Sequence, residues 1–149
     1  MNRSLDTASI SLSGREKAAQ YVALAKPRLS SSVVFSAVAG YLIAAYPFDL
    51  LEFFYLVTGG FLVVASSNAF NQIWERDRDA LMQRTKNRPL PSGRLSFTEA
   101  FVAASVYGLI GAFLLFLINP LSAGFGLLSV LLYVLVYTPM KAKGPWAVF

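Results

Sequence analysis

The chain contains neither cysteine nor histidine among its 149 residues. Without cysteine, disulfide frameworks, thiolate nucleophiles and cysteine-based metal sites are excluded. Without histidine, His-dependent zinc sites, the usual imidazole base and a His-ligated heme are excluded as well. Any metal chemistry in this protein must therefore use oxygen ligands.

Charged residues are also scarce, at 14% of the chain against 56% hydrophobic residues, which is not the balance of a soluble domain. Four apolar stretches each have roughly the length needed to cross a hydrocarbon core at about 1.5 Å per residue. They are Leu29–Tyr46, Leu51–Phe70, Ala100–Ile118 and Leu121–Tyr137. The sequence therefore predicts an all-α fold, a multi-pass transmembrane helical bundle with four spans in this chain.

Very short connections join the spans in pairs. Only Pro47–Leu50 separates the first two spans, and only Asn119 and Pro120 separate the last two. Such turns predict two antiparallel helical hairpins. Small residues spaced by four predict helix-packing ridges in the first and third spans; these are Ser36, Gly40 and Ala44, and Ala104, Gly108 and Ala112.

The positive charges predict the orientation. All 13 lysines and arginines lie before the first span, between the second and third, or after the fourth, and neither short turn carries one. Because Lys and Arg concentrate on the cytoplasmic side, the N-terminus, the central loop 71–98 and the end of the fourth span should share that side.

The first 28 residues are polar, and no apolar core follows Arg3 closely enough for a secretory signal. We therefore expect residues 1–28 to be a retained cytoplasmic tail, followed by a transmembrane domain over 29–149. The lack of an Arg- and Ser-rich transit peptide favours a bacterial membrane. Part of the tail predicts a short interfacial anchoring helix, with one apolar face formed by Ala18, Tyr21, Val22 and Ala25.

Polar residues continue directly from the second span. No proline or glycine occurs from Asn71 to Arg88, so the helix is expected to continue through this stretch. On such a helix Asn71, Glu75 and Asp79 lie on one face, because a step of four residues rotates by only about 40°. Asp77 points the other way. Oxygen-bearing side chains at membrane depth are costly unless a cation or water satisfies them, and Mg²⁺ suits them.

Magnesium usually takes one or two carboxylates, keeps several waters and completes its shell with phosphate oxygens. Four nearby basic residues would add fixed charge for a diphosphate, namely Arg84, Lys86, Arg88 and Arg94. The sequence thus predicts a magnesium-diphosphate site. By charge pattern alone, an alternating Arg/Asp run beside a membrane is more often a solvated loop with weak surface ion pairs.

The acidic segment resembles the UbiA superfamily of polyprenyl-diphosphate-dependent transferases. Its first acidic signature, Asn-Asp-x-x-Asp-x-x-x-Asp, is matched by Asn71-Gln72-x-x-Glu75-x-x-x-Asp79. Gln72 departs from this pattern with a neutral amide, so it is not assigned as a ligand. Tyr137-x-x-x-Lys141 resembles the superfamily's Tyr-x-x-x-Lys element near the end of the fourth helix.

Within the superfamily, three further runs resemble the protoheme IX farnesyltransferase (heme O synthase) family. They are Lys26-Pro27-Arg28, Asp79-x-x-Met82-x-Arg84-Thr85 and the run from Asn87 to Gly93. The last run is also similar to 4-hydroxybenzoate polyprenyltransferases and therefore identifies the superfamily better than the acceptor.

The resemblance implies a fold of roughly nine transmembrane helices, each spanning the bilayer, and a second Asp-rich motif. This chain would supply the first four helices and the catalytic loop 71–98. A fifth apolar segment only begins within 144–149, so we expect a truncated sequence whose product alone is inactive.

The implied activity is transfer of a farnesyl group from farnesyl diphosphate to a vinyl group of protoheme IX (heme b), which makes heme O. Asn71, Glu75 and Asp79 would be the catalytic and metal-binding residues, with Mg²⁺ as cofactor and heme b as substrate. Diphosphate contacts would come from Arg84, Arg88, Tyr137 and Lys141. The implied surroundings are the bilayer of a bacterial inner membrane and contact with heme A synthase or oxidase assembly, with no role for nucleic acid.

Three alternatives stay open. One is polyprenyl transfer to an aromatic quinone precursor, which product analysis with each acceptor would separate. A four-helix membrane protein with a binding or transport role predicts no magnesium-dependent binding of farnesyl diphosphate. A non-catalytic fragment would bind one substrate weakly because half of the site is missing.

Overall fold

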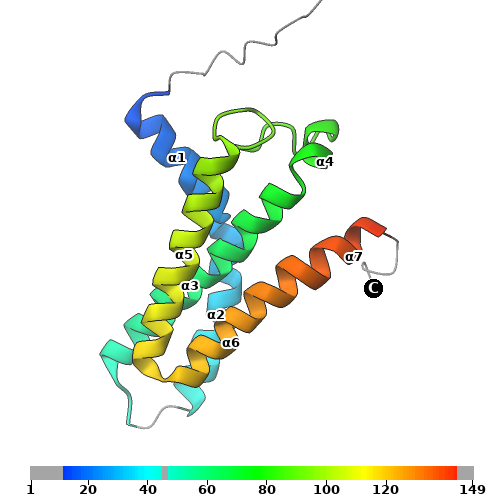
Figure 1. Ribbon diagram of the computed structural model, residues 1–149. Coiled ribbons are helices and arrows are strands. Elements are labelled where there is room, and N and C mark those ends of the chain that lie inside the picture. Colours follow the sequence, from blue (N-terminus) through cyan, green and yellow to red (C-terminus); the bar gives the residue numbers. More distant parts are fainter. Residues whose placement is uncertain (1–11, 45–46, 144–149) are drawn as a thin grey trace, which may run out of the picture.

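All regular secondary structure is helical in the part of the chain that the computed structural model describes, residues 12–44 and 47–143 (Figure 1). The predicted all-α fold is confirmed. In chain order the elements are α1 (Gly14–Ala25), α2 (Pro27–Ala44), α3 (Leu50–Trp74), α4 (Arg76–Leu81), α5 (Phe97–Ile118), α6 (Pro120–Leu132), the π-helical turn η1 (Tyr133–Tyr137) and α7 (Thr138–Lys143).

Four helical runs are long and apolar enough to cross a membrane, which confirms the four predicted spans. They are Pro27–Ala44, Leu50–Trp74, Phe97–Ile118 and the continuous run Pro120–Met140. The chain is thus a multi-pass membrane protein. Which side of the membrane carries the N-terminus stays a prediction, as do the domain boundaries, and residues 1–11 and 144–149 lie outside the described part of the chain.

Side-chain caps explain where the hairpins turn. The Asp49 carboxylate accepts hydrogen bonds from the first backbone N–H groups of α3, at Leu51 (2.7 Å) and Glu52 (2.9 Å). Asn119 ends α5 and also starts α6, because its side chain accepts from the N–H of Ser122 at 2.8 Å while Pro120 takes the first helical position. A single residue therefore suffices to reverse the chain between α5 and α6.

The closest helix packing is between α3 and α5, which lie side by side in Figure 1. Ala104 is fully buried against α3, and the Ser66 hydroxyl donates to its carbonyl at 2.8 Å. Part of the predicted ridge on α5 is thus a packing face. The predicted ridge on α2 differs, since a Cβ at Gly40 would meet nothing within 4 Å.

The predicted continuous helix from Asn71 to Arg88 is wrong. The α-helix breaks at Glu75 (φ −87°, ψ 2°), although the Glu75 N–H still donates to the Asn71 carbonyl at 2.9 Å. Helix α4 then ends at Leu81, and the Thr85 hydroxyl donates to the Asp79 carbonyl at 2.9 Å. The Thr85 hydroxyl thus satisfies a backbone carbonyl at the end of α4. Helix propensity alone does not predict such a contact.

Helix α1 is docked onto the same end of the bundle as α4 (Figure 1). Its Leu24 is fully buried in a cluster with residues of α3, α5 and the loop between α4 and α5. The Gln72 amide donates to the Leu24 carbonyl at 2.8 Å. At the other end of α1, the hydrogen-bonded Glu99 carboxylate raises the pKa of Lys17. Whether α1 also lies at the membrane interface stays a prediction.

Replacing Gln72 by Glu should loosen α1. A carboxylate cannot donate to the Leu24 carbonyl, and it would face the negative end of the α1 dipole. Loss of a buried hydrogen-bond partner costs about 1 to 3 kcal/mol, so α1 amides should exchange roughly 5- to 150-fold faster in hydrogen–deuterium exchange. Gln83→Glu, on the exposed loop, is the matched control. Equal exchange rates of the α1 amides in both variants would contradict a role of the Gln72–Leu24 hydrogen bond in holding α1.

Candidate functional site

Buried polar side chains gather where α3 runs into α4. They include Asn68, Asn71, Gln72, Glu75, Asp79 and Thr85, joined by Thr138 from α7. Among the described residues, no buried side-chain nitrogen or oxygen lacks a hydrogen-bond partner. Such a concentration of satisfied polar groups in an apolar bundle points to function, because burying polar groups has a cost that packing alone does not require.

A pocket of about 320 Å³ opens beside these residues. Its wall contains the carboxylates of Glu75 and Asp79, three guanidinium groups, and the side chains of Met82 and Thr85. The guanidinium groups belong to Arg78, Arg84 and Arg88. Three positive and two negative groups leave the wall with an excess of one positive charge, which favours a small anion together with a cation.

Asp79 is held from two sides. Its carboxylate accepts from the Arg88 guanidinium at 2.6 Å, and its carbonyl accepts from Thr85. Because Asp79 is only 4% exposed, the carboxylate side of this ion pair is shielded from water, unlike the solvated surface pairs of a simple orientation signal. The structure thus brings together two predicted site residues, Asp79 and Arg88, by pairing them with each other.

Asn71 contacts Glu75 but does not line the pocket. Its Nδ2 donates to Glu75 Oε2 at 3.1 Å, and its Oδ1 accepts from the Thr138 hydroxyl at 2.9 Å. Of the three residues predicted to bind metal, Glu75 and Asp79 therefore share the pocket wall, while the Asn71 oxygen is directed to α7.

The remaining predicted residues are placed differently. Arg84 is on the pocket wall, whereas Tyr137 is not; its ring stacks on Tyr133 with centroids 5.2 Å apart. The side chain of Lys141 lies outside the described part of the structure. Asp77 is 88% exposed and pairs with Arg76, as expected for the opposite helix face.

Sequence reasoning did not assign Arg78, Thr85 or Thr138 to the site. Arg78 and Thr85 stand within the charged run and its neighbouring motif, so their positions gave a signal. For Thr138 the sequence contains no signal beyond its place next to Tyr137, because Thr138 and Asn71 are 67 positions apart in the chain.

The pocket wall offers two carboxylates to a metal ion, those of Glu75 and Asp79. In the two described stretches, no three His, Cys, Asp or Glu side chains lie close enough to hold an ion by themselves. Two carboxylates on one wall nevertheless fit Mg²⁺, which takes one or two carboxylates and fills its shell with water and phosphate oxygens. Glu75 and Asp79 are the residues that could hold it.

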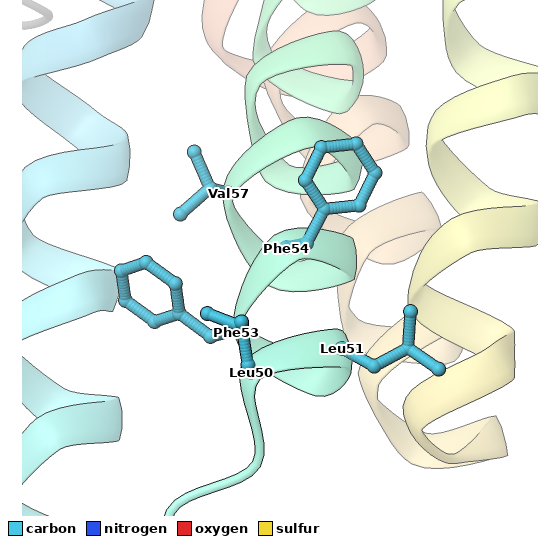
Figure 2. A pocket seen from close by; sticks show the side chains of 5 residues that line it. All are labelled: Leu50, Leu51, Phe53, Phe54 and Val57. Carbon is cyan, nitrogen blue, oxygen red and sulfur yellow. The ribbon is translucent and has the colours of Figure 1, made fainter.

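A second pocket, of about 610 Å³, lies at the other end of α3, roughly 36 Å away by helix rise. Figure 2 shows its wall of apolar side chains, with Phe53 on the side of α2 and Leu51 on the side of α5. The lining is Leu50, Leu51, Phe53, Phe54 and Val57. With no polar group on this wall, the pocket offers only apolar contact.

Known proteins resemble this chain over most of its length. The model of the UbiA prenyltransferase family matches residues 33–149. The chain is 52% identical over 126 residues to protoheme IX farnesyltransferase of Christiangramia forsetii, covering 85% of this chain and 42% of the relative. It is 46% identical over 129 residues to the Flavobacterium psychrophilum protein of the same name, covering 85% and 43%.

A eukaryotic relative, the mitochondrial protoheme IX farnesyltransferase of Eremothecium gossypii, is 37% identical over 142 residues, covering 95% of this chain and 33% of the relative. The chain thus spans less than half the length of these relatives. No solved structure matches it. With a family model that covers most of the chain and relatives of this similarity, the chain belongs to the UbiA prenyltransferase family.

Proposed function

We propose that the gene product transfers a farnesyl group from farnesyl diphosphate to a vinyl group of heme b, which makes heme O. The observation that carries this proposal is the pocket in which Glu75 and Asp79 face three arginines. The names of the relatives support the choice of donor and acceptor. The chain itself holds one part of the machinery, since it spans less than half of each relative.

The pocket suits the leaving group of the reaction. In our proposal the carbon–oxygen bond of farnesyl diphosphate breaks, and the diphosphate leaves with the electron pair. Arg84 and Arg88 bind its oxygens, because guanidinium groups match phosphate geometry. Glu75 and Asp79 hold Mg²⁺, which when bound supplies positive charge to stabilise the leaving diphosphate. A vinyl carbon of heme b then bonds to the farnesyl carbon, and water adds the hydroxyl group with loss of a proton.

The other predicted site residues keep proposed roles. We assign Asn71 to the metal site through Glu75, and Tyr137 and Lys141 to diphosphate contact from the α7 side. The stacking of Tyr137 on Tyr133 supports a fixed position for its ring. The apolar bundle would keep water from the reacting allylic carbon.

We also propose the setting of the reaction. The distribution of all 13 Lys and Arg residues supports a cytoplasmic N-terminus, and two bacterial relatives of high identity support a bacterial inner membrane. Because the product stays in the bilayer, a contact with heme A synthase or oxidase assembly is a further prediction.

Membranes that contain the full-length gene product should convert heme b to heme O when farnesyl diphosphate and Mg²⁺ are added. Chelation with EDTA should abolish the conversion, and added Mg²⁺ should restore it, since the two carboxylates and the diphosphate need the cation. Product analysis by mass spectrometry measures both effects.

Two other results of this assay would contradict the proposal. Conversion that persists in EDTA would contradict the proposed metal site. Prenyl transfer to an aromatic quinone precursor, with none to heme b, would keep the site and replace the acceptor.

A further inference from the structure

Among the residues whose burial the structure describes, Thr138 is the one buried polar residue of this region that comes from the last helical run. It is 1% exposed and follows directly on the π-helical turn η1. Its hydroxyl lies 2.9 Å from Asn71 Oδ1 and 2.8 Å from the Tyr133 carbonyl oxygen. A hydroxyl carries a single hydrogen, so it can donate to one of these two acceptors at a time.

The neighbouring groups decide which way the Asn71 amide is turned. The NH₂ group of Asn71 faces Glu75 and donates to its Oε2 at 3.1 Å, since an amide NH₂ donates and a carboxylate oxygen accepts. The amide oxygen of Asn71 then points to Thr138, and this hydrogen bond forms when the hydroxyl donates to Asn71 and not to the Tyr133 carbonyl. Without the Thr138 hydroxyl, the Asn71 amide oxygen would lose this buried hydrogen-bond donor. The amide orientation in which the NH₂ group faces Glu75 would then be less stable.

The π-helical turn brings Thr138 into reach. The Thr138 N–H donates to the Tyr133 carbonyl, five residues back, instead of to the residue four back as in an α-helix. One residue of an α-helix rotates the chain by about 100°, so an α-helical turn here would direct a different side chain to Asn71. Single π turns are frequent at functional sites, and this one directs a hydroxyl to Asn71, which contacts the Glu75 carboxylate.

We propose that Thr138 is a positioning residue of the acidic site. Its hydroxyl keeps the Asn71 amide turned so that Asn71 in turn orients the Glu75 carboxylate at the pocket. The inference rests on the proposed function, because it assigns Thr138 to the metal site that Glu75 and Asp79 form. Residues that orient ligands in this way affect metal affinity without touching the metal.

Binding of Mn²⁺ to the purified full-length gene product, followed by electron paramagnetic resonance, tests this role without relying on turnover. Thr138→Val keeps the shape and removes the hydroxyl, and it should weaken Mn²⁺ binding roughly tenfold or more. Thr138→Ser keeps the hydroxyl and should bind close to wild type. Thr138→Ala should behave like the valine variant and replaces it if that variant does not fold.

A double variant separates positioning from general packing. If Thr138 acts through Asn71, adding Thr138→Val to Asn71→Ala should weaken binding no further than Asn71→Ala alone. Ser66→Ala is the control, because it removes another buried hydroxyl-to-carbonyl bond far from the pocket and should leave Mn²⁺ affinity unchanged.

Three outcomes would overturn the role of Thr138. Wild-type affinity in both Thr138→Val and Thr138→Ala is one, and additive losses in the double variant are another. A wild-type protein that binds no Mn²⁺ would overturn the proposed metal site as well, so the two failures are distinguishable.

Discussion

Glu75→Gln should lower the rate of farnesyl transfer by the full-length gene product roughly 100- to 1,000-fold, the range found when one group that stabilises developing charge is removed. Glutamine has the size of glutamate and can still accept a hydrogen bond from Asn71 through its amide oxygen. The fold should therefore persist while the pocket loses one of its two negative charges. Steady-state formation of heme O, at saturating Mg²⁺, measures the effect.

Asp77→Asn provides the matched control. It makes the same chemical change two residues away, at a side chain that is 88% exposed and paired with Arg76 at the surface. Surface pairs of this kind contribute little, so the rate should stay near wild type. Equal rates for Glu75→Gln and wild type would remove Glu75 from the site, and an equal loss in both variants would point to the charge of the whole segment instead.

Among single Gly→Ala substitutions in the described helices, Gly111→Ala should destabilise the protein most. A Cβ at Gly111 would lie 2.8 Å from the Gly59 carbonyl oxygen and 2.8 Å from the Val63 nitrogen, both backbone atoms of α3. Backbone cannot give way as a flexible side chain can, so α5 would have to move off α3. Overpacking of this kind costs about 1 to 3 kcal/mol, and unfolding in detergent measures it.

Gly124→Ala makes the same substitution on α6, where an added Cβ meets nothing within 4 Å. It should be neutral or slightly stabilising, since alanine is favoured over glycine within a helix. Opposite changes in stability for the two variants would show that the cost comes from the close contact between α3 and α5. Similar stability changes in both would contradict it.

Much of the fold could be predicted from the sequence because membrane spans depend on properties of whole segments. Length and hydropathy suffice to locate four helices, and prolines and short polar runs locate the turns. Where a helix ends depends on single side chains, as at Leu81, where Thr85 and Arg88 bind back to Asp79. The helix propensity of the residues before Leu81 does not predict these contacts.

The candidate site shows the same division. Spacing by four correctly placed Glu75 and Asp79 on one wall, since the backbone bond from Asp79 to Glu75 (2.8 Å) keeps the helical path across the break. It could not anticipate that the Asn71 oxygen would turn to Thr138. That contact requires a π-helical turn far along the chain, and helical periodicity assumes a constant 3.6 residues per turn.

The separation of 67 residues between Asn71 and Thr138 also orders the assembly of the protein during its synthesis. At about 5 to 20 residues per second, Thr138 is synthesised roughly 3 to 13 s after Asn71. During the first part of that interval α5, which begins at Phe97, has not yet been made, and during the whole of it the polar cluster lacks the Thr138 hydroxyl. Because an unpartnered polar group is costly in an apolar surrounding, the Asn71 oxygen needs another hydrogen-bond donor, such as water, until Thr138 has been made.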